Sequence, residues 1–467
     1  MQPSLWYGEF LMSFLKDKVF LKQILLLSLP IALQNLITSI LNIFDQLMVG
    51  WLPENADNCL SAVLLANQVV FIYQIVVFAA CNTANIFIAQ YTAAGKKERI
   101  PRVVGFLLLI GSVICVAFST LCAGAPQFVI DLFAPNPDYA YLAGDFLGVV
   151  AYSFIPMGFS IMLNFMMRGI KRMKVGMAAN IVGVICNIIL NYLFMFGGFG
   201  IEGMGLIGAA YGTIVSRIVE FIIIFTGCVL FRYPILASPK VMFSFEKRFV
   251  AQYFKMFFPI LCNEIFWVLS TTMFLYVYDK LPSSEIALAA MNIAQSVDKI
   301  VSVVMTGIGS AAGIIIGNVI GGGDREKVID YSRKSLSFSI FTGVLIGLMT
   351  FGAAFFAPAL FTEVSVAAKE TARNLLFLYA LTAVLRNIAF MAVIGILRSG
   401  GDTTFCMISE TLAIWFVSIP LVFFGGLVMQ WNIYVLYLLA NVCEVIKAIC
   451  FITRIKRGKW LKFVVEH

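Results

Sequence analysis

Charge and histidine are what this sequence has least of. Only 12% of its 467 residues are charged, whereas an ordinary soluble domain carries about 25%. The single histidine is His467, the last residue, so histidine-based catalysis and histidine-containing metal sites are excluded. Because 61% of the residues are hydrophobic, a water-soluble fold could not hide so much apolar surface behind so few charges. Most of the chain must therefore lie in lipid.

Motifs for nucleotide hydrolysis, zinc binding and disulfide formation are also missing. No G-x-x-x-x-G-K-[ST] phosphate-binding loop occurs, so ATP is not expected as an energy source. The ten cysteines form no Cys-x-x-Cys pair and most lie in apolar runs, which is typical of small core residues. No Ser/His pair or shared carboxylate motif indicates a membrane enzyme. The prediction is a protein that is not an enzyme and has no cofactor.

Twelve apolar runs are long enough to cross a bilayer, which takes roughly 20 residues. They lie near 23–51, 60–90, 103–124, 140–167, 175–197, 205–230, 253–279, 285–318, 335–357, 371–397, 403–426 and 430–453. The predicted fold class is an all-α membrane protein with twelve transmembrane helices. Three lysines precede the first run, and no cleavage site of small residues follows a short apolar core, so we expect no cleavable signal peptide.

Basic residues gather in alternate connections between these runs. They cluster before the first run, between runs two and three, four and five, six and seven, and eight and nine, and in the tail. Between runs ten and eleven Arg398 is the only base. Because basic connections stay in the cytoplasm, we expect both termini there and a multi-pass protein of the plasma (inner) membrane. The bases form no single patch, so we expect no nucleic-acid partner.

The two halves of the chain resemble each other at matched spacing. The matches are SLPIALQN (28–35) with FFPILCNE (257–264), GKKE (95–98) with GDRE (323–326), and MMRGIKR (166–172) with ILRSGGD (396–402). Three short matches in the same order indicate an internal repeat. Six spans per half is an even number, so the two repeats are parallel. The predicted domains are a lobe over 1–232, a cytoplasmic linker over 233–247 and a second lobe over 248–467.

With this repeat, several segments together resemble the multidrug and toxic-compound extrusion (MATE) family, bacterial type, from about Leu21 to Trp460. They are FDQLMVG on the first span, RGIKRMKVGMAANIVGVICNIILNYLFMFGGFG leading into GMGLIGAAYGTIVSR, FPILCNEIFW at the start of the second half, and LRSGGDT. The resemblance implies two six-helix lobes that form a V around a central cavity. It also implies export of organic cations or drugs in exchange for protons or sodium ions. We expect a monomeric secondary antiporter embedded in the lipid bilayer.

Asp45 is a lone carboxylate on the first span, about 9 Å from the outer end of that span at 1.5 Å per residue. An acid within the membrane is costly and usually faces the protein interior. Counting from the outer ends of their spans puts Asn191 and Thr213 at a similar depth, and Asn187 is one turn from Asn191 on the same face. The alternative is that these polar groups only join helices by hydrogen bonds.

In the family that this chain resembles, a cation site contains an acid on helix one, Asn and Asp on helix five, and Thr on helix six. Asp45 and Asn187 match this set directly and Thr213 less closely. Asn191 departs from it, because a carboxylate is common there. With one negative charge missing, we favour proton coupling, or sodium coupling through Glu264, over a tight sodium site at Asp45. No other metal site is expected.

The second half has intramembrane charges of its own, which are candidates for coupling or substrate binding. They are Glu264, Asp298, Arg386 and Glu410, with Lys299, Glu444 and Lys447 nearby. Glu264 is the one we favour for coupling or for a cationic substrate, and structural ion pairing is the role we expect for most of the others. Arg386 needs an acid, and we predict Glu264 or Glu410 as its partner. The rival function is a flippase for a lipid-linked precursor in the same superfamily, which would need bases such as Lys299 and Arg386.

Overall fold

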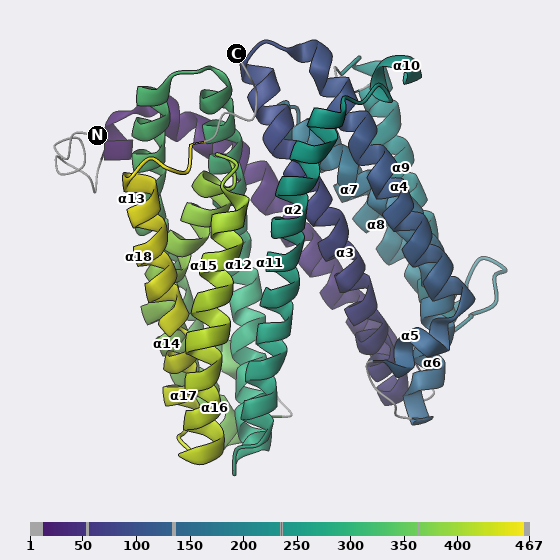
Figure 1. Ribbon diagram of the computed structural model, residues 1–467. Helices are drawn as coiled ribbons and strands as arrows, with labels where there is room; N and C mark the ends of the chain where they lie inside the picture. Colours follow the sequence, from purple (N-terminus) through teal and green to yellow (C-terminus); the bar gives the residue numbers. More distant parts are fainter. Residues whose placement is uncertain are drawn as a thin grey trace. The chain divides into compact units, whose positions relative to one another are not determined.

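The computed structural model describes residues 13–52, 56–132, 137–233, 235, 237–361 and 364–461 (Figure 1). Regular structure in these residues is helical, apart from one isolated bridge between Gly198 and Ile201. Twelve helical runs in the described residues are long and apolar enough to cross a membrane. The predicted all-α membrane fold and its number of spans are confirmed.

The chain forms two compact units. The first-half unit contains Leu33–Tyr253, and the second-half unit contains Met1–Ala32 together with Phe254–His467. The division falls inside two long helices, α2 (Lys18–Gly50) and α11 (Lys247–Asp279), each of which contains one proline in its first half, Pro30 or Pro259. The domain boundaries drawn from the sequence stay a prediction.

The first-half unit consists of the second part of α2 and the helices that follow it. These are α3 (Ala56–Ala93), η3 (Lys97–Arg99), α4 (Ile100–Gly124), α5 (Pro126–Asp131), α6 (Pro137–Val150), η4 (Ala151–Ser153), α7 (Phe154–Gly169), α8 (Lys174–Phe196), α9 (Leu206–Leu230) and α10 (Pro239–Met242). Helix α3 packs on α4, α6 and α7, and α8 packs along α9. Helix α8 ends because Gly197 takes a φ of 83°, a conformation that glycine adopts without strain.

The second-half unit begins with α1 (Ser13–Lys16) and the start of α2, and resumes with α11. Its other helices are α12 (Ser284–Gly321), α13 (Arg325–Phe356), η5 (Ala357–Leu360), α14 (Val366–Phe390), η6 (Met391–Leu397), α15 (Thr403–Ala413), η7 (Ile414–Ser418), α16 (Ile419–Phe423), η8 (Phe424–Val428), α17 (Ile433–Ala440) and α18 (Val442–Lys456). Three of these, η6, η7 and η8, are π-helical. Such segments are rare and often lie at functional sites.

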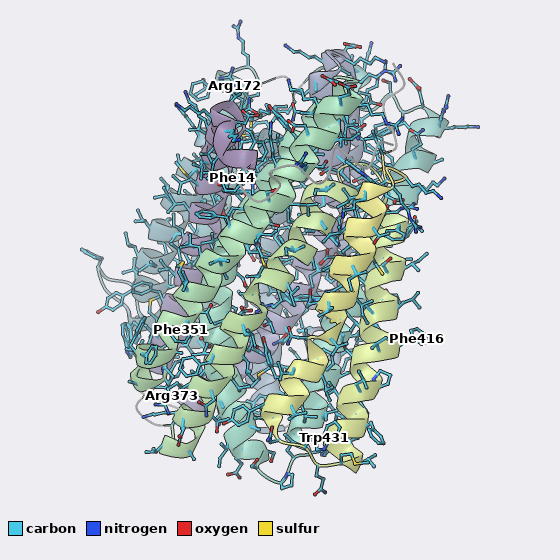
Figure 2. All side chains as sticks on the ribbon, turned by 90° about the vertical axis from the view of Figure 1, so that its left-hand side faces the viewer. Phe14, Arg172, Phe351, Arg373, Phe416 and Trp431 are labelled. Atoms are coloured by element: carbon cyan, nitrogen blue, oxygen red, sulfur yellow. The ribbon has the colours of Figure 1, made fainter. Side chains whose placement is uncertain are left out.

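The outer faces of the second-half unit are apolar. Phe351 on α13 and Phe416 on η7 point away from their helices in Figure 2, and Phe416 is 71% exposed. Arg373 and Trp431 lie toward the same end of the unit in that view. Exposed large apolar side chains on this scale would be a liability in water. In a bilayer they are the lipid-facing surface, with basic and Trp side chains suited to its edge.

Candidate functional site

Two glycines of α9 allow α8 and α9 to approach closely. A Cβ atom on Gly208 would lie 2.3 Å from the backbone oxygen of Phe194, and one on Gly212 would lie 2.1 Å from Oδ1 of Asn191. Glycines four apart are a common device for close packing of membrane helices. This packing brings the polar residues that follow Gly212 on α9 to the asparagines of α8.

The four residues predicted for the first lobe meet in one hydrogen-bonded cluster. Nδ2 of Asn191 donates to Oδ1 of Asp45 at 2.9 Å and to Oδ1 of Asn187 at 3.1 Å. Nδ2 of Asn187 lies 3.4 Å from Oγ1 of Thr213. Both asparagines are buried. Helices α2, α8 and α9 therefore place Asp45, Asn187, Asn191 and Thr213 together, and the role of this cluster in coupling stays a prediction.

Three further polar residues of α9 were missed by the sequence analysis. Ser216 accepts a hydrogen bond of 3.1 Å from Nδ2 of Asn187. Arg217 donates to Oε2 of Glu220 at 2.8 Å, and Glu220 is buried. The signal was available, because opposite charges three residues apart on an apolar span indicate an ion pair. Arg217 pairs with Glu220 and also lies close enough to act electrostatically on Asp45, whose direct hydrogen-bond partner is the neutral amide of Asn191.

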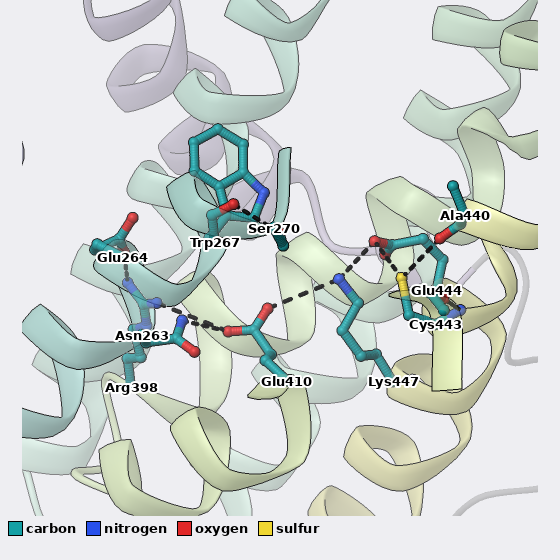
Figure 3. A network of polar contacts seen from close by, with 11 residues as sticks. Asn263, Glu264, Trp267, Ser270, Arg398, Glu410, Ala440, Cys443, Glu444 and Lys447 are labelled. Carbon is teal, nitrogen blue, oxygen red and sulfur yellow. Dashed lines mark hydrogen bonds and ion pairs between the residues drawn. The ribbon is translucent and has the colours of Figure 1, made fainter. Parts of the chain in front are cut away.

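A row of alternating charges, here called the second-half ladder, joins α11, the end of the tenth span, α15 and α18 (Figure 3). Its members are Glu264, Arg398, Glu410, Lys447 and Glu444. Arg398 donates to Oε1 of Glu264 at 2.8 Å and lies 3.9 Å from Oε2 of Glu410. Nζ of Lys447 lies 3.9 Å from the other oxygen of Glu410 and pairs with Glu444. Three acids and two bases leave the ladder with a formal charge of minus one.

The predicted partner of Arg386 is wrong. Nη2 of Arg386 donates to Oδ2 of Asp298 at 2.7 Å, and its guanidinium lies 5.2 Å from the centre of the Tyr379 ring. Helices α12 and α14, which carry this pair, pack directly on each other. Glu264 and Glu410 are instead engaged in the ladder. The prediction failed because the sequence does not show which helices are neighbours.

Arg398 also differs from its expected setting. The sequence presents it as the one base of a connection, but its side chain is buried and binds Glu264. It follows directly after the π-helical segment η6. Arg398, which the sequence analysis used as a signal of membrane orientation, is therefore part of the buried polar network.

The match to a known protein family has the same two-part pattern as the internal repeat. The family model MatE matches residues 30–193 and again residues 259–424. The chain belongs to the MatE (MATE) family. It is 26% identical over 422 residues to a protein of Thermotoga maritima named probable multidrug resistance protein NorM, covering 86% of this chain and 85% of that one. It is 23% identical over 464 residues to the uncharacterized transporter YisQ of Bacillus subtilis, covering 96% of each.

Solved structures of MATE proteins share the fold. A crystal structure described as MATE in the bent conformation superposes with a TM-score of 0.83 at 18% identity, covering 97% of this chain and 98% of that one. A transporter of the MOP superfamily from Pyrococcus furiosus gives a TM-score of 0.84 at 17% identity, covering 97% and 99%. At these identities the likeness concerns the fold. This MATE protein is a multi-pass membrane transporter.

Proposed function

We propose that this MATE protein exports organic cations or drugs across the plasma membrane by alternating access, as a secondary antiporter driven by an ion gradient. The Asp45 cluster is the observation that carries the proposal. In this cluster the Asp45 carboxylate of α2 accepts a hydrogen bond from Asn191 of α8, which is linked through Asn187 to Thr213 of α9. An ionisable side chain within the membrane costs free energy, so its presence there favours a functional role in binding an ion or a proton. Relatives named for multidrug resistance support a drug as the substrate.

The hydrogen bonds of this cluster favour a proton as the coupling ion. Asn191 presents its N–H to Asp45, whereas a sodium ion between them would require the amide oxygen there, because hard cations bind oxygen. The second carboxylate of the region, Glu220, is already neutralised by Arg217. We therefore assign the coupling proton to Asp45, with Asn187, Asn191 and Thr213 orienting the carboxyl group.

In the second-half unit, Glu264 is the residue proposed for coupling or for contact with a cationic substrate. Its side chain is 28% exposed, against 17% for Glu410. Arg398 contacts its Oε1, whereas Glu410 is shared among Asn263, Arg398 and Lys447. Glu264 is thus the accessible end of a ladder that carries one excess negative charge. Asp298 and Arg386 neutralise each other and act as a structural pair.

The rival flippase function needs bases that are free to hold phosphate. Arg386 pairs with Asp298, and Lys299 is exposed. The ion pair of Arg386 removes one of the two bases on which this hypothesis rests. The antiporter proposal is retained because the Asp45 carboxylate supports it.

The test is transport of a fluorescent organic cation in proteoliposomes that hold the full chain. We expect an imposed proton gradient to drive transport, and Asp45→Asn to abolish it without loss of expression. Glu202→Gln, a change of an exposed acid, is the matched control and should transport normally. Transport at the wild-type rate by Asp45→Asn would refute the proposal.

Sodium titration of the purified protein separates the two coupling ions. Asn191→Asp adds a second carboxylate beside Asp45, and we expect it to strengthen sodium binding. Tight sodium binding by the native chain that disappears in Asp45→Asn and persists in Glu264→Gln would replace the proton with sodium at this site.

A further inference from the structure

One contact of the second-half ladder has a counterpart in the first half. Arg168 and Arg398 occupy the same position of the matched segments MMRGIKR (166–172) and ILRSGGD (396–402), and their partners Gln34 and Glu264 lie in the matched segments SLPIALQN (28–35) and FFPILCNE (257–264). Arg168 donates to Oε1 of Gln34 at 2.8 Å, and Arg398 donates to Oε1 of Glu264 at 2.8 Å, and both bonds join residues 134 apart.

In the first half the arginine of this contact has a neutral partner. Arg168 binds the amide of Gln34, whereas Arg398 binds the carboxylate of Glu264. Arg168 pairs with no carboxylate in the part of the chain that the structure describes. It is therefore a guanidinium without a counter-charge, near the end of the span Tyr139–Gly169.

Arg168 has a hydrogen-bond donor left open. Its Nε is buried and has no hydrogen-bond partner among the described residues. The guanidinium lies 4.8 Å from the centre of the Phe165 ring, and its amide partner Gln34 is buried. A cation removed from water is costly without an anion. A guanidinium offers its N–H groups in a planar fork that fits a carboxylate or a phosphate.

We propose that Arg168 binds an anionic group, a carboxylate or a phosphate, supplied by a ligand in place of the acid that the second half carries in its own chain. Two sources have this chemistry: a soluble anion and the headgroup of an acidic lipid. The proposal does not rest on antiport or on the coupling ion, and its test measures binding rather than transport.

The experiment uses the full chain in phosphatidylcholine nanodiscs and follows thermal unfolding. One arm adds sodium phosphate or sodium benzoate at constant ionic strength, with chloride as the balancing anion. The other arm replaces part of the lipid with phosphatidylglycerol. We expect at least one arm to raise the Tm of the wild type. In Arg168→Gln the apparent affinity for that anion should fall about tenfold or more, as the loss of a charged hydrogen bond implies.

Two further variants make the outcome decisive. Gln34→Glu keeps Arg168 and gives it a carboxylate partner within the chain, so the Tm of this variant should no longer respond to anions. If Arg168→Gln does not fold, Gln34→Glu is the variant that tests the proposal. Arg172→Gln removes an exposed arginine of the same connection and should respond like the wild type. A response to the soluble anions alone identifies a soluble ligand, and one to phosphatidylglycerol alone identifies a headgroup.

Three results would overturn the proposal. The first is the absence of a wild-type response in both arms. The second is a full response in Gln34→Glu. The third is an equal loss in Arg172→Gln and Arg168→Gln, which would show general binding to surface charge.

Discussion

Three ionisable side chains in membrane helices are held by partners of three different kinds. Asp45 receives a neutral N–H group from Asn191, Arg386 binds the acid Asp298, and Arg168 binds the amide of Gln34. Because charge in hydrocarbon is expensive, the partner decides the role. Of these three, Arg386 is neutralised by its partner and is structural, whereas the direct partners of Asp45 and Arg168 are neutral, which leaves these two for an ion or a ligand.

Removal of Arg386 is expected to strand the charge of Asp298. Breaking a buried ion pair by removing one partner costs about 3–5 kcal/mol. The two side chains are 21% and 25% exposed, so we expect Arg386→Ala to lower the free energy of unfolding by an amount at the lower end of that range. Adding Asp298→Asn should restore part of the loss, as measured by thermal unfolding in detergent.

Glu264→Gln serves as the control for this pair, because Glu264 belongs to the ladder with Arg398. Combined with Arg386→Ala, it should restore no stability. If it restores more than Asp298→Asn does, then Arg386 does not have the partner that the structure gives it.

Asp17, which precedes α2 outside the membrane span, should give the protein a pH-dependent stability. Burial raises the pKa of Asp17, but the ion pair with Lys334 and hydrogen bonds from the backbone N–H groups of Val19 and Phe20 outweigh it, so this pKa lies below its ordinary value. The ionised form therefore stabilises the fold above the unfolded pKa of about 3.9, and this contribution is lost as pH falls through the folded pKa.

Thermal unfolding of Asp17→Asn between neutral pH and about pH 3 tests this linkage. We expect the variant to be less stable than the wild type at neutral pH, and the difference to shrink in acid. A difference that stays constant over the whole range would mean that the carboxylate of Asp17 has no stabilising role.

At the scale of helices, close packing of α8 and α9 is what assembles the Asp45 cluster. A methyl group on Gly212 would meet Oδ1 and the backbone nitrogen of Asn191 at 2.1 and 2.8 Å. Overpacking of this kind costs about 1–3 kcal/mol. We expect Gly212→Ala to lower thermal stability and, because Asn191 must shift, to reduce proton-driven transport as well.

Gly352→Ala on α13 is the matched control, since its added Cβ would meet nothing within 4 Å. Alanine is also the better helix former, so stability should be unchanged or slightly higher and transport normal. Equal losses in the two variants would mean that helix flexibility, rather than the contact of Gly212 with α8, explains the effect.

Helix positions could be predicted from the sequence because each span is a long apolar run. Depth along a span was equally accessible, and it brought Asp45, Asn191 and Thr213 to one level. Lateral neighbours were not accessible, because they depend on how each helix is rotated and on what packs beside it. For this reason the partner of Arg386 was predicted wrongly, and the burial of the Arg398 side chain against Glu264 was not predicted.

At the scale of the whole molecule, the two halves of the repeat have the same helical architecture but different charged side chains. Both halves match the same family model, and both join an arginine to a polar residue 134 positions earlier. In the second half Arg398 has the acid Glu264 as its partner, and in the first half Arg168 has the amide Gln34. The two halves thus share one architecture and offer ions and ligands two different electrostatic environments.

The orientation of the whole molecule can be tested by cysteine labelling. Twelve spans and the distribution of basic residues predict that Lys97 and Glu326 lie on the cytoplasmic side, and Glu202 and Lys280 on the outer side. All four side chains are exposed. We expect a membrane-impermeant maleimide added to intact cells to label Glu202→Cys and Lys280→Cys above the wild-type background. Lys97→Cys and Glu326→Cys should be labelled only after the membrane is opened.

Within each pair, one position lies in each half of the chain, so the labelling also tests whether the two repeats are parallel. Parallel halves require Lys97 to agree with Glu326, because these two occupy equivalent connections, after the second and the eighth span. They also require Glu202 to agree with Lys280, because two spans separate these positions. An inverted repeat would reverse the second-half member of each pair. If Glu326→Cys were labelled from outside while Lys97→Cys were not, an odd number of spans would separate the two positions, and the six-plus-six arrangement would be wrong.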